Sequence, residues 1–79
     1  MNKQEALKVL GSECRNARRK HLRSQAYIAT MHAGCSVENI SKFERGQNCN
    51  VMLLMAYKPY IEDMGALMNK VWEVYNRDT

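Results

Sequence analysis

Apolar residues recur at helical spacing along most of the chain. In the first third, one series with intervals of three and four residues consists of Leu7, Leu10, Cys14, Ala17 and His21. Residues at these intervals lie on one face of an α-helix, so the series predicts a helix over residues 3–20 with one buried stripe. Strand-like alternation, internal repeats and low-complexity stretches are absent from the sequence. The pattern therefore predicts an all-α fold.

Two shorter helices are predicted next, each begun by a serine. Ser24 is a good N-cap for a second helix over residues 25–33, which Gly34 ends. Ser36 offers another N-cap, and the apolar positions behind it predict a third helix over residues 37–45. The second and third helices are thus joined by a tight turn at Gly34.

The rest of the chain predicts two further helices. Residues 47–50 are typical of a loop whose last residue caps a short fourth helix over residues 51–57. Pro59 disfavours helical geometry at the residue before it but suits the first turn of a new helix, so a break is expected there. From Tyr60 onward, apolar residues cover more than one stripe of a terminal helix. We therefore expect one domain, with its core in residues 1–58 and a C-terminal helix in residues 59–79.

The charge of the chain is uneven. Residues 1–46 carry nine Lys and Arg against four Asp and Glu, whereas residues 47–79 carry three against four. An amino-terminal excess of positive charge is expected where a protein meets a polyanion. A solvated basic face would give the same count, so charge alone leaves both interpretations open.

Cysteine usage and hydropathy indicate the compartment. Cys14, Cys35 and Cys49 have no regular spacing, which argues against a disulfide framework and favours a reducing environment. No apolar run approaches the roughly 20 residues that span a bilayer, and the first residues lack the apolar stretch of a signal peptide. We expect a soluble, cytoplasmic protein without membrane association.

The pair of helices around Gly34 matches a helix-turn-helix, in which the second helix projects into the DNA major groove. Residues 10–25, LGSECRNARRKHLRSQ, and residues 36–46, SVENISKFERG, resemble the corresponding segments of phage Cro/repressor-type regulators, the Xre-like family. The resemblance covers about residues 10–57. It implies a five-helix, lambda-repressor-like DNA-binding domain with a long C-terminal helix, encoded by a bacterium or a phage.

One departure from the family pattern lies between Ser24 and Gly34, where the chain has one residue more. The family usually has three residues in the space that is filled here by Thr30, Met31, His32 and Ala33. The second helix is therefore expected to be longer, or to be shifted by one residue.

The resemblance assigns base contacts to the third helix, and helix starts are expected to hold phosphate. The residues expected to contact bases are Val37, Glu38, Asn39 and Lys42. Glu38 could accept from the cytosine amine and Lys42 could donate to guanine, while Asn39 suits adenine and Val37 suits the thymine methyl group. The residues expected to contact phosphate are Ser24, Gln25, Ser36, Arg19 and Arg23. The alternatives are plain N-capping by the serines and a solvated basic face.

The resemblance also implies an ion pair between Arg18 and Glu44, which would link the first and third helices and be structural rather than catalytic. A weaker interpretation is a zinc site made of His21, His32, Cys35 and Cys49. These residues lack the paired spacing of zinc ligands, and a Cys-His nucleophile would lack a third, orienting residue. We expect no metal, no cofactor and no enzymatic activity.

The terminal helix indicates a partner. The residues expected at a dimer interface are Ile61, Met64, Met68, Val71, Trp72 and Tyr75. Their spacing fits a partner helix, although the same residues could simply close the core of a five-helix domain. The favoured hypothesis is a homodimeric transcriptional regulator, a repressor, bound to two-fold related sites on double-stranded DNA. The alternative is a protein-interaction module, such as an antirepressor or antitoxin, that keeps the helix-turn-helix fold and binds a protein partner.

Overall fold

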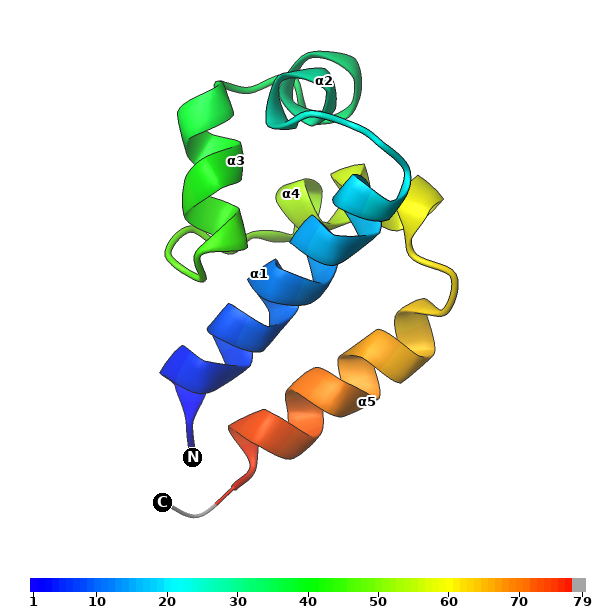
Figure 1. Ribbon diagram of the computed structural model, residues 1–79. Helices are drawn as coiled ribbons and strands as arrows, with labels where there is room; N and C mark the ends of the chain where they lie inside the picture. The colour runs from blue at the N-terminus through cyan, green and yellow to red at the C-terminus, as the bar shows by residue number, and fades with distance from the viewer. Residues whose placement is uncertain (78–79) are drawn as a thin grey trace.

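The structure, a computed structural model, describes residues 1–77 as helices joined by short connections (Figure 1). The α-helices are α1 (Lys3–Lys20), α2 (Gln25–Ile28), α3 (Val37–Glu44), α4 (Val51–Ala56) and α5 (Met64–Tyr75). A π-helical turn, η1 (Ala29–Ala33), continues α2, and a 3₁₀ turn, η2 (Lys58–Tyr60), follows α4. Residues 1–77 contain no strand, so the all-α class is confirmed. None of these helices has the length and apolar character that crossing a lipid bilayer requires.

The short helices begin at the N-caps that the sequence predicts. The hydroxyl of Ser24 accepts from the N–H of Tyr27 at 3.0 Å. The hydroxyl of Ser36 accepts from the N–H of Asn39 at 3.3 Å, and Asn50 caps α4 through its side-chain oxygen. Each cap satisfies one of the amide groups that lack a partner in the first turn, and such a cap contributes about 1 kcal/mol.

A π-helical turn, η1, lies in the stretch between Ser24 and Gly34 where the resemblance predicts one additional residue. The helix that begins at Gln25 continues to Ala33, but its winding changes from α to π at Ala29. A π turn holds one residue more than an α turn, so the second helix is longer while Ser24 keeps its place as N-cap. Gly34 then ends the helix at φ 63°, a left-handed conformation that glycine adopts at little cost.

The C-terminal helix begins later than predicted. The break at Pro59 is present, but this residue lies in the 3₁₀ turn, and α5 starts only at Met64. Asp63 is the N-cap of α5 and accepts from the N–H of Ala66 at 3.0 Å. The apolar positions from Tyr60 onward concealed this second start, because Ile61 stands at helical spacing from Met64 although its backbone is extended.

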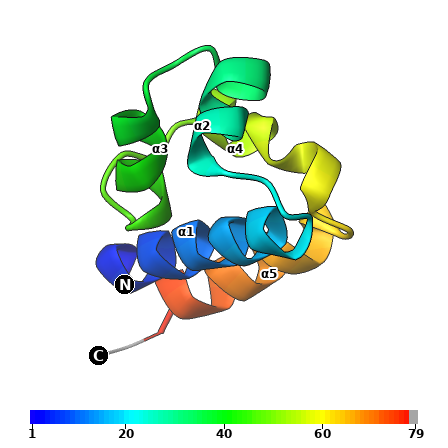
Figure 2. The ribbon, with the colours of Figure 1, turned by 45° about the horizontal axis from the view of Figure 1, so that its top comes forward.

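Helix α1 packs against both α5 and α3. Figures 1 and 2 both show α5 running alongside α1 in the opposite direction, while α2, α3 and α4 lie on another side of α1. The N–H of Asn2 donates to the carbonyl of Tyr75 at 2.7 Å, and Lys70 of α5 forms an ion pair with Glu13 of α1. These contacts fix α5 along the length of α1.

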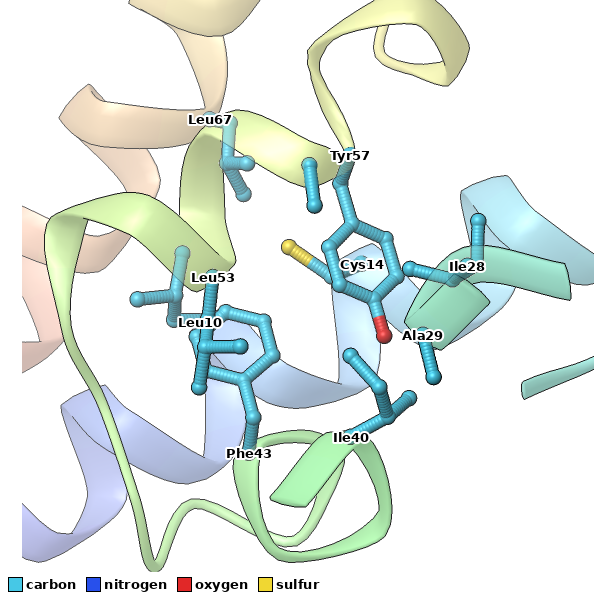
Figure 3. Packing of buried hydrophobic residues seen from close by; sticks show 10 residues of the cluster. Leu10, Cys14, Ile28, Ala29, Ile40, Phe43, Leu53, Tyr57 and Leu67 are labelled. Atoms are coloured by element: carbon cyan, nitrogen blue, oxygen red, sulfur yellow. The ribbon is translucent and has the colours of Figure 1, made fainter. Parts of the chain in front are cut away.

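The hydrophobic core lies between α1 and the shorter helices (Figure 3). Its buried members are Leu10, Cys14, Ile28, Ala29, Ile40, Phe43, Leu53, Ala56, Tyr57 and Leu67. Full burial of one large side chain of this kind contributes roughly 1.5–3 kcal/mol. Because α2, η1 and α3 each supply buried residues, the core holds residues 25–44 against α1.

Helices α1 and α3 approach each other closely at Gly11. A Cβ atom at this position would lie 2.5 Å from the carbonyl oxygen of Phe43 and 2.6 Å from that of Glu44. Backbone atoms cannot give way as the end of a flexible side chain can. Glycine at position 11 therefore permits the crossing that sets the end of α3 against α1.

The Gly11→Ala substitution is expected to lower the free energy of unfolding by about 1–3 kcal/mol, the usual cost of overpacking. Gly65→Ala is the matched control, because a Cβ on this residue of α5 would meet only Asp63 Oδ1, at 3.4 Å. At position 65 alanine is expected to stabilise by up to about 1 kcal/mol through its helix propensity. Urea unfolding followed by circular dichroism measures both changes. Equal effects at the two positions would contradict the close approach.

Candidate nucleic-acid interface

One side of α3 points away from the protein. The buried residues of this helix are Ile40, Phe43 and Glu44. With about 3.6 residues per turn, Glu38 and Lys42 fall on the opposite side, and Arg45, the exposed residue after the helix, follows them. The side chains of Glu38 and Lys42 are 74% and 44% exposed. We call Glu38, Lys42 and Arg45 the outer face of α3.

The four residues expected to contact bases are accessible. Val37 and Glu38 are exposed in the first turn of α3, and Asn39 and Lys42 are half-buried. The Lys42 ammonium lies 3.4 Å from the Glu38 carboxylate, so the two side chains form an ion pair across one helical turn. The protein's own chain therefore leaves Val37 and Glu38 open and covers Asn39 and Lys42 only in part.

The residues expected to contact phosphate fall into two groups. The exposed group consists of Ser24, Ser36, Arg19 and Arg23. The guanidinium of Arg23 lies 4.5 Å from the ring centre of Tyr27, a cation–π contact that holds it against α2. Gln25 differs, because its side-chain amide donates to Glu44 Oε1 at 3.0 Å. A phosphate contact by Gln25 would therefore have to come from its backbone.

Glu44, at the end of α3, accepts hydrogen bonds from three other segments. Arg18 donates from Nε at 2.7 Å and from Nη2 at 2.9 Å. The ion pair implied by the resemblance is therefore present, and it is bidentate. The hydroxyl of Tyr57 donates at 2.6 Å and the amide of Gln25 at 3.0 Å. We call Arg18, Gln25, Glu44 and Tyr57 the Glu44 network. It joins α1, α2, α3 and the end of α4.

Burial and hydrogen bonding act in opposite directions on the pKa of Glu44. Burial raises this pKa, but the hydrogen bonds from Arg18, Tyr57 and Gln25 outweigh it and hold the pKa below its ordinary value. The hydrogen bond to Glu44 raises the pKa of Arg18. Burial, followed by the hydrogen bond to Glu44, raises the pKa of Tyr57. At neutral pH the network therefore contains a charged carboxylate, a charged guanidinium and a neutral phenol.

Three residues have roles that the sequence did not reveal. Tyr57 and Gln25 belong to the Glu44 network, and Arg45 extends the outer face of α3. A signal was available for Tyr57, because a tyrosine that ends an apolar helix must find a partner for its hydroxyl when buried. Gln25 had no such signal, since it lies in a helix start where a solvent-facing role is equally common.

The histidines and cysteines of the alternative zinc site have other surroundings. His32 Nε2 lies 2.7 Å from the Tyr60 hydroxyl, and the ring of His21 packs against the same tyrosine. Within the described chain, residues 1–77, no three His, Cys, Asp or Glu side chains gather as metal ligands would. Cys14 is a core residue, and burial raises its pKa to about 12, which keeps the thiol protonated.

The residues expected at a dimer interface are divided between core and surface. Those partly buried against the protein's own core are Ile61, Met64, Met68 and Val71. Trp72 is 59% exposed and stacks on Tyr75, with ring centroids 6.0 Å apart. Ala6 and Leu7 of α1 line an apolar groove beside these rings. Four of the six residues are therefore partly covered by the core, and Met68, Val71, Trp72 and Tyr75 line the groove.

Comparison with models of known protein families, with curated proteins and with solved structures finds no match for this chain. Function is therefore inferred from the side chains on the outer face of α3 and from the contacts that hold this helix. These contacts are the core packing of Ile40 and Phe43 and the hydrogen bonds of Glu44.

The Tyr57→Phe substitution removes one hydrogen bond to Glu44 and keeps the ring in the core. The free energy of unfolding is expected to fall by about 1.5–3 kcal/mol, the range for a hydrogen bond to a charged group. Tyr60→Phe is the matched control, because its hydroxyl meets His32 at the surface, and a loss below about 1 kcal/mol is expected. Thermal denaturation measures both variants. A loss in Tyr60→Phe as large as that in Tyr57→Phe would contradict the role given to Glu44.

The lowered pKa of Glu44 predicts that the stabilisation from the hydrogen bond between Tyr57 and Glu44 depends on pH. A carboxyl group whose pKa is lower in the folded state stabilises the fold above its unfolded pKa, about 4.5. This stabilisation is lost as the pH falls through the folded pKa. The difference in unfolding free energy between the wild type and Tyr57→Phe should therefore shrink below about pH 4.5. Urea unfolding over a pH series measures this difference, and a constant value down to acid pH would contradict the assignment.

Proposed function

We propose that the chain is a DNA-binding transcriptional regulator of the Xre-like, Cro/repressor type, with a lambda-repressor-like domain. Helix α3 would lie in the major groove and its outer face would contact base edges. One observation carries the proposal: Glu38 and Lys42 project from a helix whose opposite side is fixed in the core. A helix held in this way has its side chains oriented before binding, which favours specific contacts. The protein would act by binding alone, without a cofactor or catalysis.

The distribution of charge supports this proposal. Nine of the twelve Lys and Arg residues lie in residues 1–46, which contain the two helices of the motif. Arg19 and Arg23 are exposed next to the start of α2, where they would neutralise phosphates. The helix starts at Ser24 and Ser36 would bring backbone N–H groups to the same phosphates and orient the domain.

We further propose that the regulator binds as a homodimer and represses. A single short helix contacts few bases, and two linked copies on a two-fold related site would bind far more tightly than one. The half-sites would lie about one DNA turn apart, roughly 34 Å. The exposed ring of Trp72 and the adjoining groove supply the apolar surface that joins the copies. A dimer of this kind most simply represses by blocking access of other proteins to its site.

A protein-interaction module, such as an antirepressor or antitoxin, is the second candidate, and α4 favours it. Val51, Met52 and Met55 of this helix are exposed, Met52 to 74%. Methionine side chains are flexible and polarisable, so they adapt readily to a partner surface. Under this alternative, α4 would carry the binding, and substitutions on the outer face of α3 would leave it unchanged.

Selection of bound sequences from a random pool of duplexes tests the proposal. We expect one enriched motif with two-fold symmetry, and an affinity for that motif that falls steeply as salt rises, because bound protein displaces counterions. Sedimentation of the complex measures how many copies bind. If no duplex is bound in a salt-sensitive way, the proposed function is wrong.

The Lys42→Met substitution separates the two candidates. It should weaken binding to the selected duplex by about 5- to 150-fold, the loss expected for one good contact to a base. Lys58→Met is the matched control, because this exposed lysine lies on η2 and the substitution removes the same charge. For Lys58→Met we expect the affinity for the duplex to change less than about threefold, because an exposed charge away from the contact is screened by salt. Equal effects of the two substitutions, measured by fluorescence anisotropy, would contradict a specific role for α3.

A further inference from the structure

Glu38 and Lys42 form an ion pair on the outer face of α3, with 3.4 Å between Lys42 Nζ and Glu38 Oε1. We propose that this pair recognises one C·G base pair as a unit. The inference rests on the proposed function, because it requires α3 to lie in the major groove. It assigns sequence specificity to two side chains acting together rather than to each alone.

The separation of the two charged groups matches what a C·G pair presents in the major groove. The cytosine N4 amine is a donor, and guanine O6 beside it is an acceptor. A Watson–Crick hydrogen bond joins these two atoms, so they lie about 2.9–3.0 Å apart. A carboxylate oxygen and an ammonium nitrogen 3.4 Å apart can therefore meet them side by side, Glu38 on cytosine and Lys42 on guanine.

The neighbouring atoms of the base pair select C·G over A·T. In A·T the adenine amine and thymine O4 are also a donor and an acceptor, but adenine N7 beside the amine would repel the carboxylate. Thymine offers the ammonium only O4, next to a methyl group. In C·G the guanine offers both O6 and N7 to Lys42, while cytosine places no acceptor beside its amine.

Pairing also explains how an acidic residue can face DNA. A lone carboxylate on the outer face of α3 would be repelled by the phosphates, whereas the pair of Glu38 and Lys42 has no net charge. The Glu38 side chain is largely open to solvent and the Lys42 side chain is about half exposed, so the two can reach a ligand together. The ordinary role of such a pair, to stabilise the helix across one turn, would create no base preference at all.

The double substitution Glu38→Lys with Lys42→Glu tests the proposal, because it keeps the ion pair and the net charge but reverses their order. Selection from a random duplex pool should give the wild type one C·G position in each half-site, and should give the swapped protein G·C at that position. In direct binding, each protein should favour its own duplex by about fivefold or more. The double substitution Glu38→Gln with Lys42→Met removes both charges with little change of shape. It should lose the preference at this position while keeping the rest of the motif.

The outcomes separate this inference from the proposed function. A wild-type motif without a C·G position, or a position that stays C·G in both substituted proteins, would overturn the inference and leave the DNA-binding proposal standing. Failure of the wild type to bind any duplex would overturn both. Circular dichroism shows whether each substituted protein is folded. If the swapped protein is unfolded, the test is whether the protein with Glu38→Gln and Lys42→Met loses the C·G preference, and a retained preference would overturn the inference.

Discussion

A carboxylate taken out of water is costly unless nearby donors compensate it, and in this chain the compensation for Glu44 comes from distant segments. Arg18 lies 26 positions away along the chain, Gln25 lies 19 and Tyr57 lies 13. Loss of a buried partner of this kind typically costs 3–5 kcal/mol, roughly half the stability of a small domain. The fold therefore depends on α1, α2, α3 and the end of α4 meeting at one carboxylate.

This arrangement gives the two sides of α3 different tasks. One side is fixed by Phe43 and Glu44, and the close crossing at Gly11 leaves little room for the helix to move. The other side carries Glu38 and Lys42 outward. The π-helical turn η1 precedes Gly34, and the helices on either side of this turn keep their N-caps at Ser24 and Ser36. Stability on the inside thus sets the orientation of the side chains that we propose to contact DNA.

Local signals in the sequence were enough to predict α1, the N-caps at Ser24 and Ser36, and the extent of α3, because periodicity and capping act within a few residues. The resemblance added the pair of Arg18 and Glu44. The start of α5 was missed because Ile61 continues the helical spacing of apolar residues although its backbone is extended. The place of Tyr57 was missed because its partner is fixed only by the packed fold. Spacing also could not show that Ile61, Met64, Met68 and Val71 are partly buried against the core while Trp72 stays exposed.

Chemical-shift mapping of the ¹⁵N-labelled protein during titration with its selected duplex tests the central claim most directly. The account predicts that amide signals of Val37, Glu38, Lys42 and the start of α2 shift together, while the Arg18 Nε–H signal stays in place because its bond to Glu44 is kept. Shifts confined to α4 and α5, or loss of the Arg18 signal on binding, would contradict the account that the Glu44 network holds α3 in place for contact with DNA.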